Sequence, residues 1–190
     1  MNTLKIQQDF ILKLPSTRFL VIHAFLEMKR GNRNILKPPL NIEDPRERGF
    51  FTQLIQGMVR YERLLEEELK QRVRRRNKLQ GSVSAIIKLG FFELLFMERV
   101  PARASIHQAG WLAERFRVQA AKPLINGVLR KFLNELDQGY DPENVHSFSI
   151  YESFPIWMLQ RWRADYGEEK ARELAKASNR FLGIHLSLHF

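Results

Sequence analysis

The segment "IIKLGFFELLFM", residues 86–97, constrains the fold more than any other part of this 190-residue chain. Its apolar residues follow helical spacing but cover nearly every side of the helix, so other helices have to enclose it. The run is interrupted by Lys88 and Glu93 and is shorter than the roughly 20 apolar residues of a membrane span. The sequence therefore predicts a helix over 81–97 at the centre of a bundle, and no membrane partner.

Amphipathic segments on both sides supply the enclosing helices. Apolar spacing predicts a first helix over 16–30, with Ser16 or Thr17 as its cap and His23 on its apolar face. Asp44-Pro45 predicts the start of a helix that continues to about Val73. Further helices are predicted after Pro101 and over 125–136, 153–166 and 168–178. The final "GIHLSLHF" alternates apolar and polar residues, which is compatible with one terminal strand.

The basic charge is confined to the first part of the chain. Residues 1–140 hold 25 Lys and Arg against 14 Asp and Glu, whereas residues 141–190 hold 6 against 7. A local excess of this size favours a polyanionic partner, most often a nucleic acid. The stretch "DQGYDPENVHS" lies where the balance changes and contains Gly, Pro and Asn, which is typical of a linker.

Candidate RNA-binding residues come from this basic part. The run "RVRRRNK" concentrates five cations that can contact phosphates, although cations near a helix end are also favoured for structural reasons. Three further cations near the ends of central helices extend the candidate surface, with a simple solvated surface as the alternative. The residues are Arg72, Arg74, Arg75, Arg76, Lys78, Arg103, Arg130 and Lys131.

Three segments of the chain resemble known proteins. "IIKLGFFELLFMERVPARASIHQAGWLAE" at 86–114 and "INGVLRKFL" at 125–133 resemble the NusB family of all-α RNA-binding domains. "YESFPIWMLQRWRADYGEEKARELAKASNR" at 151–180 is similar to the segment that follows such a domain in 16S rRNA cytosine-C5 methyltransferases of the RsmB (Sun/Fmu) type. The resemblance implies a NusB-like RNA-binding domain over 1–138, a linker over 139–150 and a helical connector over 151–190. It also adds Arg18, in the basic segment that leads into the first helix, to the RNA-binding candidates.

The resemblance also implies chemistry that these 190 residues do not carry. The methyltransferases bind S-adenosylmethionine and use a cysteine pair, and this chain has neither a cysteine nor a glycine-rich loop after a strand. We expect no cofactor, no metal site and no catalytic residue in this chain, with S-adenosylmethionine only in an attached catalytic domain. The absence of cysteine is compatible with a cytoplasmic location.

Two functions remain open at this point. The favoured one is docking of rRNA for methylation by a catalytic domain outside this chain. The alternative is a stand-alone transcription antitermination or ribosome-biogenesis adaptor that binds RNA and a protein partner. Three aromatic residues of the connector fit base stacking, or packing against the bundle or an absent domain; they are Trp157, Trp162 and Tyr166.

Overall fold

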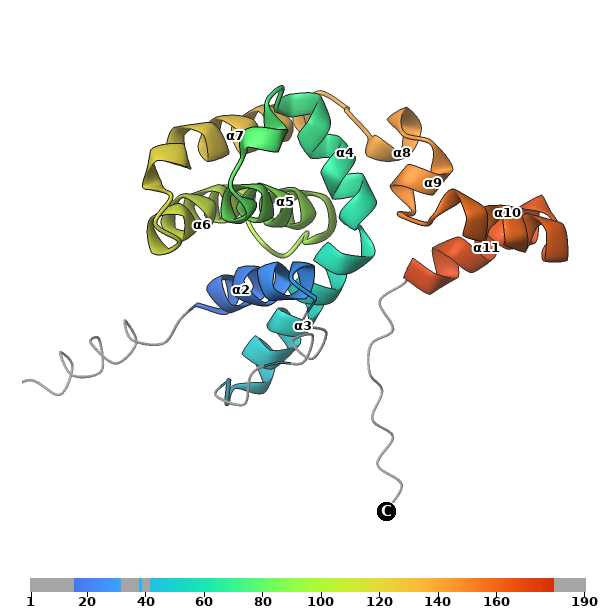
Figure 1. Ribbon diagram of the computed structural model, residues 1–190, viewed down its shortest axis with the longest axis horizontal. Helices are drawn as coiled ribbons and strands as arrows, with labels where there is room; N and C mark the ends of the chain where they lie inside the picture. Colours follow the sequence, from blue (N-terminus) through green and yellow to red (C-terminus); the bar gives the residue numbers. More distant parts are fainter. Residues whose placement is uncertain (1–15, 32–37, 39–41, 180–190) are drawn as a thin grey trace, which may run out of the picture. The chain divides into compact units, whose positions relative to one another are not determined.

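The computed structural model describes residues 16–31, 38 and 42–179 of the chain (Figure 1). These residues form helices and connecting turns, and the described part contains no strand. The expectation of an all-α fold is confirmed, while the terminal strand predicted near residue 190 lies outside the described residues. The chain divides into unit 1, Met1–Asp141, and unit 2, Pro142–Phe190. No helix in the described ranges is long and apolar enough to cross a membrane.

Unit 1 is a bundle built around one helix. Its elements are α2 (Thr17–Lys29), α3 (Pro45–Arg60), α4 (Glu62–Arg72), η2 (Arg76–Lys78), α5 (Gly81–Phe96), α6 (Ala102–Arg115), η3 (Gln119–Ala121) and α7 (Lys122–Asp137). Helix α5 contacts α2, α3, α4, α6 and α7, as its all-round apolar sequence predicted. Phe91 and Phe92 are fully buried, and the Phe91 ring meets that of Phe132 on α7 edge-on at 4.6 Å.

The two charged residues of α5 are buried and each has a partner on a neighbouring helix. The Lys88 ammonium lies 2.6 Å from a carboxylate oxygen of Glu66 on α4. The Glu93 carboxylate accepts a 2.7 Å hydrogen bond from Arg18 Nε on α2. A buried charge without a partner is strongly destabilising, so these pairs fix which faces of α2 and α4 meet α5.

Glycines allow α3 and α7 to pack closely against α5. A Cβ atom on Gly57 of α3 would lie 2.0 Å from Cζ of Phe92, well inside van der Waals contact. A Cβ atom on Gly90 of α5 would lie 2.5 Å from Leu129 Cδ2 on α7. By contrast, Gly127 of α7 has open space where its Cβ would be.

Unit 2 contains a helical hairpin. Its elements are α8 (Pro142–Val145), α9 (Phe148–Tyr151), α10 (Ile156–Tyr166) and α11 (Glu168–Asn179). Gly167 joins α10 to α11 with φ of 82°, a left-handed conformation that favours glycine. Near the end of α11, the buried Asn179 amide donates to the backbone carbonyl of Glu152 at 2.7 Å and to its carboxylate at 2.9 Å. This clamp holds α11 against the turn that precedes α10.

Three local features of unit 1 bear on the predictions from sequence. Ser16 caps α2 by accepting a hydrogen bond from the Phe19 amide, as predicted. The single helix predicted from Pro45 to about Val73 is wrong, because the chain breaks at Tyr61, whose ring stacks on Phe96 with centroids 4.2 Å apart. The placement of His23 on an apolar face is also wrong, since this side chain is exposed.

We predict opposite effects of adding one methyl group at two helical glycines. Gly57→Ala should lower the free energy of unfolding by about 1–3 kcal/mol, because the Phe92 ring occupies the space of the new Cβ. Gly127→Ala should raise it by up to about 1 kcal/mol, because alanine favours the helix and meets no neighbour. Urea unfolding followed by circular dichroism measures both, and equal effects would contradict the close packing of α3 on α5.

Candidate nucleic-acid interface

The basic run begins with an arginine that is part of the core. Arg72, the last residue of α4, has a side chain only 4% exposed. Its guanidinium pairs with the carboxylate of Glu68, which is fully buried, and its Nε donates to Glu135 of α7 at 3.0 Å. The guanidinium also lies over the Phe132 ring, 4.4 Å from its centroid, and over the Tyr140 ring at 5.1 Å. Arg72 therefore joins α4, α7 and the end of unit 1.

Tyr140 completes this arrangement. Its hydroxyl lies 3.0 Å from Glu68 Oε1 and donates a hydrogen bond to it. Burial raises the pKa of Tyr140 and the adjacent Glu68 carboxylate raises it further, to about 12, against the opposing effect of Arg72. Burial alone would lower the pKa of Arg72, but Glu68 and the hydrogen bonds to Glu135 and Tyr140 raise it above its usual value. Arg72 therefore stays protonated, and the carboxylates of Glu68 and Glu135 balance its positive charge within unit 1.

The residues that follow Arg72 have a different environment. Arg74 and Arg75 lie in the turn after α4, and Lys78 ends the short helix η2; all three are exposed. Among the described residues, none of these three side chains has a carboxylate partner. The side chain of Arg76 lies outside the described part of the structure. Three cations of the run are therefore available to an external anion.

A cation of α7 shares a carboxylate partner with Arg72, the residue at which α4 ends. Glu135 contacts Arg72 through one carboxylate oxygen, and its other oxygen lies 3.8 Å from Lys131 Nζ. Arg72 and Lys131 thus contact the two oxygens of one carboxylate, which brings a cation of α7 toward the residue from which the loop starts. We name this surface the basic edge; its residues are Arg74, Arg75, Lys78 and Lys131. Arg130, also exposed, precedes Lys131 on α7.

Three other candidates from the sequence stand apart from the basic edge. Arg18 is bonded to the buried Glu93 and covers the Phe50 ring, 4.9 Å from its centroid. The charge of Arg18, like that of Arg72, is balanced by a buried carboxylate of the bundle. Arg103 is exposed in the first turn of α6, a helix that contributes no residue to the basic edge. RNA contacts by Arg18, Arg72 and Arg103 stay predictions.

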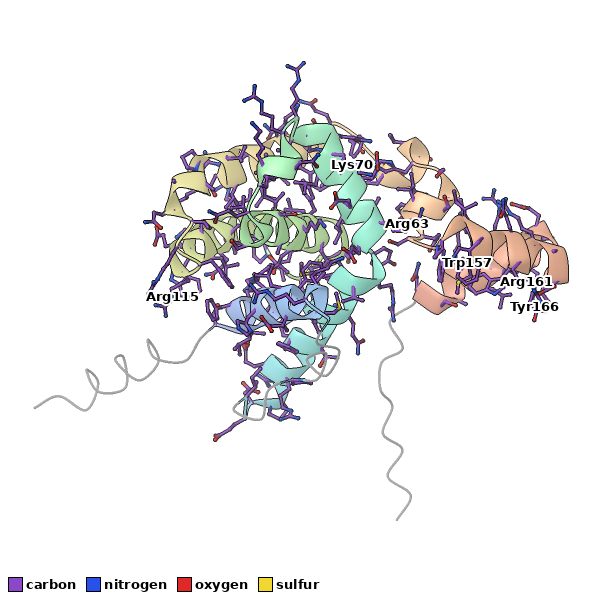
Figure 2. All side chains as sticks on the ribbon, viewed as in Figure 1. Arg63, Lys70, Arg115, Trp157, Arg161 and Tyr166 are labelled. Atoms are coloured by element: carbon purple, nitrogen blue, oxygen red, sulfur yellow. The ribbon has the colours of Figure 1, made fainter. Side chains whose placement is uncertain are left out.

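Two exposed cations outside the candidate set are visible in Figure 2. Lys70 lies on α4 four positions before Arg74 and pairs with Glu67 at 2.9 Å. Arg115 ends α6, with its guanidinium 5.0 Å from the centre of the Trp111 ring. The closeness of Lys70 to the basic run was the available signal for that residue, whereas nothing in the sequence distinguished Arg115.

The geometry of the basic edge suits phosphate contact and offers no chemistry beyond it. Its cations project from a loop and a helix surface, so they can neutralise a polyanion without enclosing a small molecule. Contacts of this kind orient a nucleic acid and carry no base sequence directly. In the ranges that the structure describes, no three His, Asp or Glu side chains gather closely enough to hold a metal ion.

The fold and this surface define a helical domain with a basic edge. Comparison with known proteins gives its family. The model of the NusB family matches residues 15–134, so the chain belongs to the NusB family. This confirms the resemblance of its central helices to that family.

Relatives fall into two groups. The probable ribosomal RNA small subunit methyltransferase B of Bacillus subtilis is 26% identical over 172 residues, which cover 87% of this chain and 38% of that protein. Methyltransferase B of Thermus thermophilus is 29% identical over 162 residues, 83% of this chain and 37% of that one. The transcription antitermination protein NusB of Bacillus subtilis is 28% identical over 91 residues, 47% of this chain and 70% of that protein. The chain thus spans little more than a third of the methyltransferases it matches.

Two neighbouring arginines should respond differently to removal. Arg72→Ala should lower the free energy of unfolding by about 3–5 kcal/mol, because the buried Glu68 carboxylate loses its counter-charge. Arg74→Ala should change it by less than about 0.5 kcal/mol, because that side chain is exposed. Thermal or urea unfolding of both variants checks this, and a stable Arg72→Ala protein would refute the structural role of Arg72.

The raised pKa of Tyr140 gives a pH dependence with a defined sign. The unfolded chain ionises this phenol near pH 10, whereas the folded protein does so at about 12. The contribution of the Tyr140 phenol to the free energy of unfolding is therefore fully present below about pH 10 and is lost as the pH rises through 12. Urea unfolding at several pH values should show this decline, and Tyr140→Phe should lack the part due to the phenol. A decline of the same size in both proteins would contradict the assignment.

Proposed function

We propose that unit 1 binds RNA through the basic edge. The observation that carries the proposal is the division of the basic run: Arg72 is neutralised in the core, while Arg74, Arg75 and Lys78 are exposed and have no carboxylate partner among the described residues. Cations in this state release counterions when they meet phosphates, which favours binding at low salt. Membership of the NusB family supports RNA as the polyanion.

The RNA is proposed to be rRNA, held for methylation at cytosine C5. The supporting observation is the extent of the matches: those to methyltransferase B cover 83–87% of this chain and so extend beyond unit 1 into unit 2, whereas that to NusB covers 47%. S-adenosylmethionine would then be used by a catalytic domain outside these 190 residues, in the cytoplasm. Isolated, this chain should bind rRNA without transferring a methyl group.

The second candidate function is that of an antitermination or ribosome-biogenesis adaptor. It is supported by the similarity to NusB proteins, of which the chain covers about 70%. Such an adaptor would bind a protein partner together with RNA. Pull-down with ribosomal proteins, compared with binding of rRNA fragments alone, separates the two functions.

Removal of charge from the basic edge should weaken RNA binding in a salt-dependent way. For Arg74→Ala/Arg75→Ala we expect a lower affinity for rRNA fragments at low salt. The slope of log K against log salt should fall by about 0.7–0.9 for each phosphate that the variant no longer neutralises. Filter binding over a salt series measures both quantities.

A matched control is Arg46→Ala, which removes an exposed arginine from the first turn of α3, outside the basic edge. It should leave the slope nearly unchanged. The control removes one charge and the double variant two, so an equal loss of affinity per charge removed would show only a general effect of net charge. Absence of RNA binding by the unaltered protein at low salt would refute the proposed function.

A further inference from the structure

The three aromatic residues of α10 occupy different environments. Trp162 packs on Phe154, with ring centroids 5.2 Å apart, and is half-buried. Trp157 and Tyr166 are 66% and 61% exposed and are labelled in Figure 2. One aromatic residue therefore belongs to the packing of unit 2, while two present their rings to the solvent.

The two exposed rings do not form a continuous apolar strip. Nine positions separate Trp157 from Tyr166, which is about two and a half helical turns, so their Cα–Cβ bonds leave α10 on opposite sides. The residues one turn after Trp157 are polar, Gln160 and Arg161, and the other large exposed apolar residue of this helix is Ile156. A protein interface with an apolar centre requires a larger contiguous patch than this.

Arg161 gives the exposed indole a charged neighbour. It lies four positions after Trp157, so both side chains project from the same side of α10. The Arg161 side chain is 75% exposed, and its Nε donates to Asp165, which is also exposed, at 2.8 Å. An exposed pair of this kind contributes little stability, so the guanidinium can exchange Asp165 for an incoming phosphate at low cost.

We propose that Trp157 and Arg161 form a binding site for one nucleotide of single-stranded RNA, with the base stacked on the indole and the phosphate at the guanidinium. The site rests on the RNA binding proposed above and adds a second kind of contact to it. Stacking of this type needs an unpaired base, because bases inside a duplex already stack on each other. The site therefore favours single-stranded segments of the RNA.

The test uses the full chain with a mixed-sequence single-stranded RNA and its duplex form. Trp157→Ala should weaken binding of the single strand on the order of tenfold, with little effect on the duplex and on the salt slope, because an indole carries no charge. Trp157→Phe should retain most of the affinity because phenylalanine also stacks. Tyr166→Ala, which removes a similarly exposed ring from the opposite side of α10, is the matched control and should bind as the unaltered protein does.

Arg161→Gln tests the phosphate contact separately. It should lower the salt slope for the single strand by about 0.7, the value for one phosphate contact. Tryptophan emission should be quenched by the single strand, and Trp157→Phe should lose most of that quenching while still binding. This spectroscopic difference would not follow from a purely structural role of Trp157.

The outcomes separate this proposal from the preceding one. Unchanged single-strand affinity in Trp157→Ala, or an equal loss of affinity for single strand and duplex, would overturn the nucleotide site. If Trp157→Ala changed only self-association or the binding of another protein, the face around Trp157 would be assigned to that partner. This result would also overturn the nucleotide site. The basic edge is tested independently by Arg74→Ala/Arg75→Ala, so either surface can fail while the other stands. No RNA binding by the unaltered protein would overturn both.

Discussion

The complete enclosure of α5 is the constraint on which the rest of unit 1 depends. An apolar helix with no polar face has to be covered on all sides, and five other helices contact it. Two charged residues remain inside this cover, and each requires an opposite charge at one defined position. Lys88 obtains it from Glu66 and Glu93 obtains it from Arg18. Hydrophobic burial thus supplies most of the stabilisation, while these two pairs select the arrangement of α4 and α2.

The same requirement explains how the basic run is divided. Glu68 is fully buried on α4, so one arginine has to be withdrawn from the surface to neutralise it. Arg72 is one helical turn away and fills this role, with Glu135 and two aromatic rings around it. Arg74, Arg75 and Lys78 follow the end of α4, and their side chains are exposed to solvent. A stretch that looks uniform in composition therefore contains a core residue followed by exposed cations.

Periodicity was sufficient to predict the longer helices, but the predicted linker over 139–150 contains α8 and most of α9. Periodicity also failed where the structure depends on contacts between distant residues. The central position of α5 and the cap at Ser16 follow from local pattern, and the structure has both. The break at Tyr61 does not, because the ring that stacks on it belongs to Phe96 of another helix. Likewise, Glu93, the partner of Arg18, lies 75 positions away, so no local signal marks that arginine as internal. Arg72 has a local partner in Glu68, but Glu135 lies 63 positions away, and spacing alone does not show that the pair is buried.

Sequence spacing is also insufficient to assign roles to the aromatic residues of α10. Helical spacing of Trp157, Trp162 and Tyr166 is compatible with a packing face or a stacking surface, and only the neighbours of each ring distinguish them. Phe154 covers Trp162, whereas Trp157 has an exposed arginine beside it. The two proposed surfaces would then contribute by different physics: the basic edge through phosphates and in proportion to released counterions, Trp157 through an unpaired base and almost independently of salt. A chain that carried both surfaces, one on each unit, would bind RNA of any sequence weakly and still prefer an RNA with an exposed, unpaired segment.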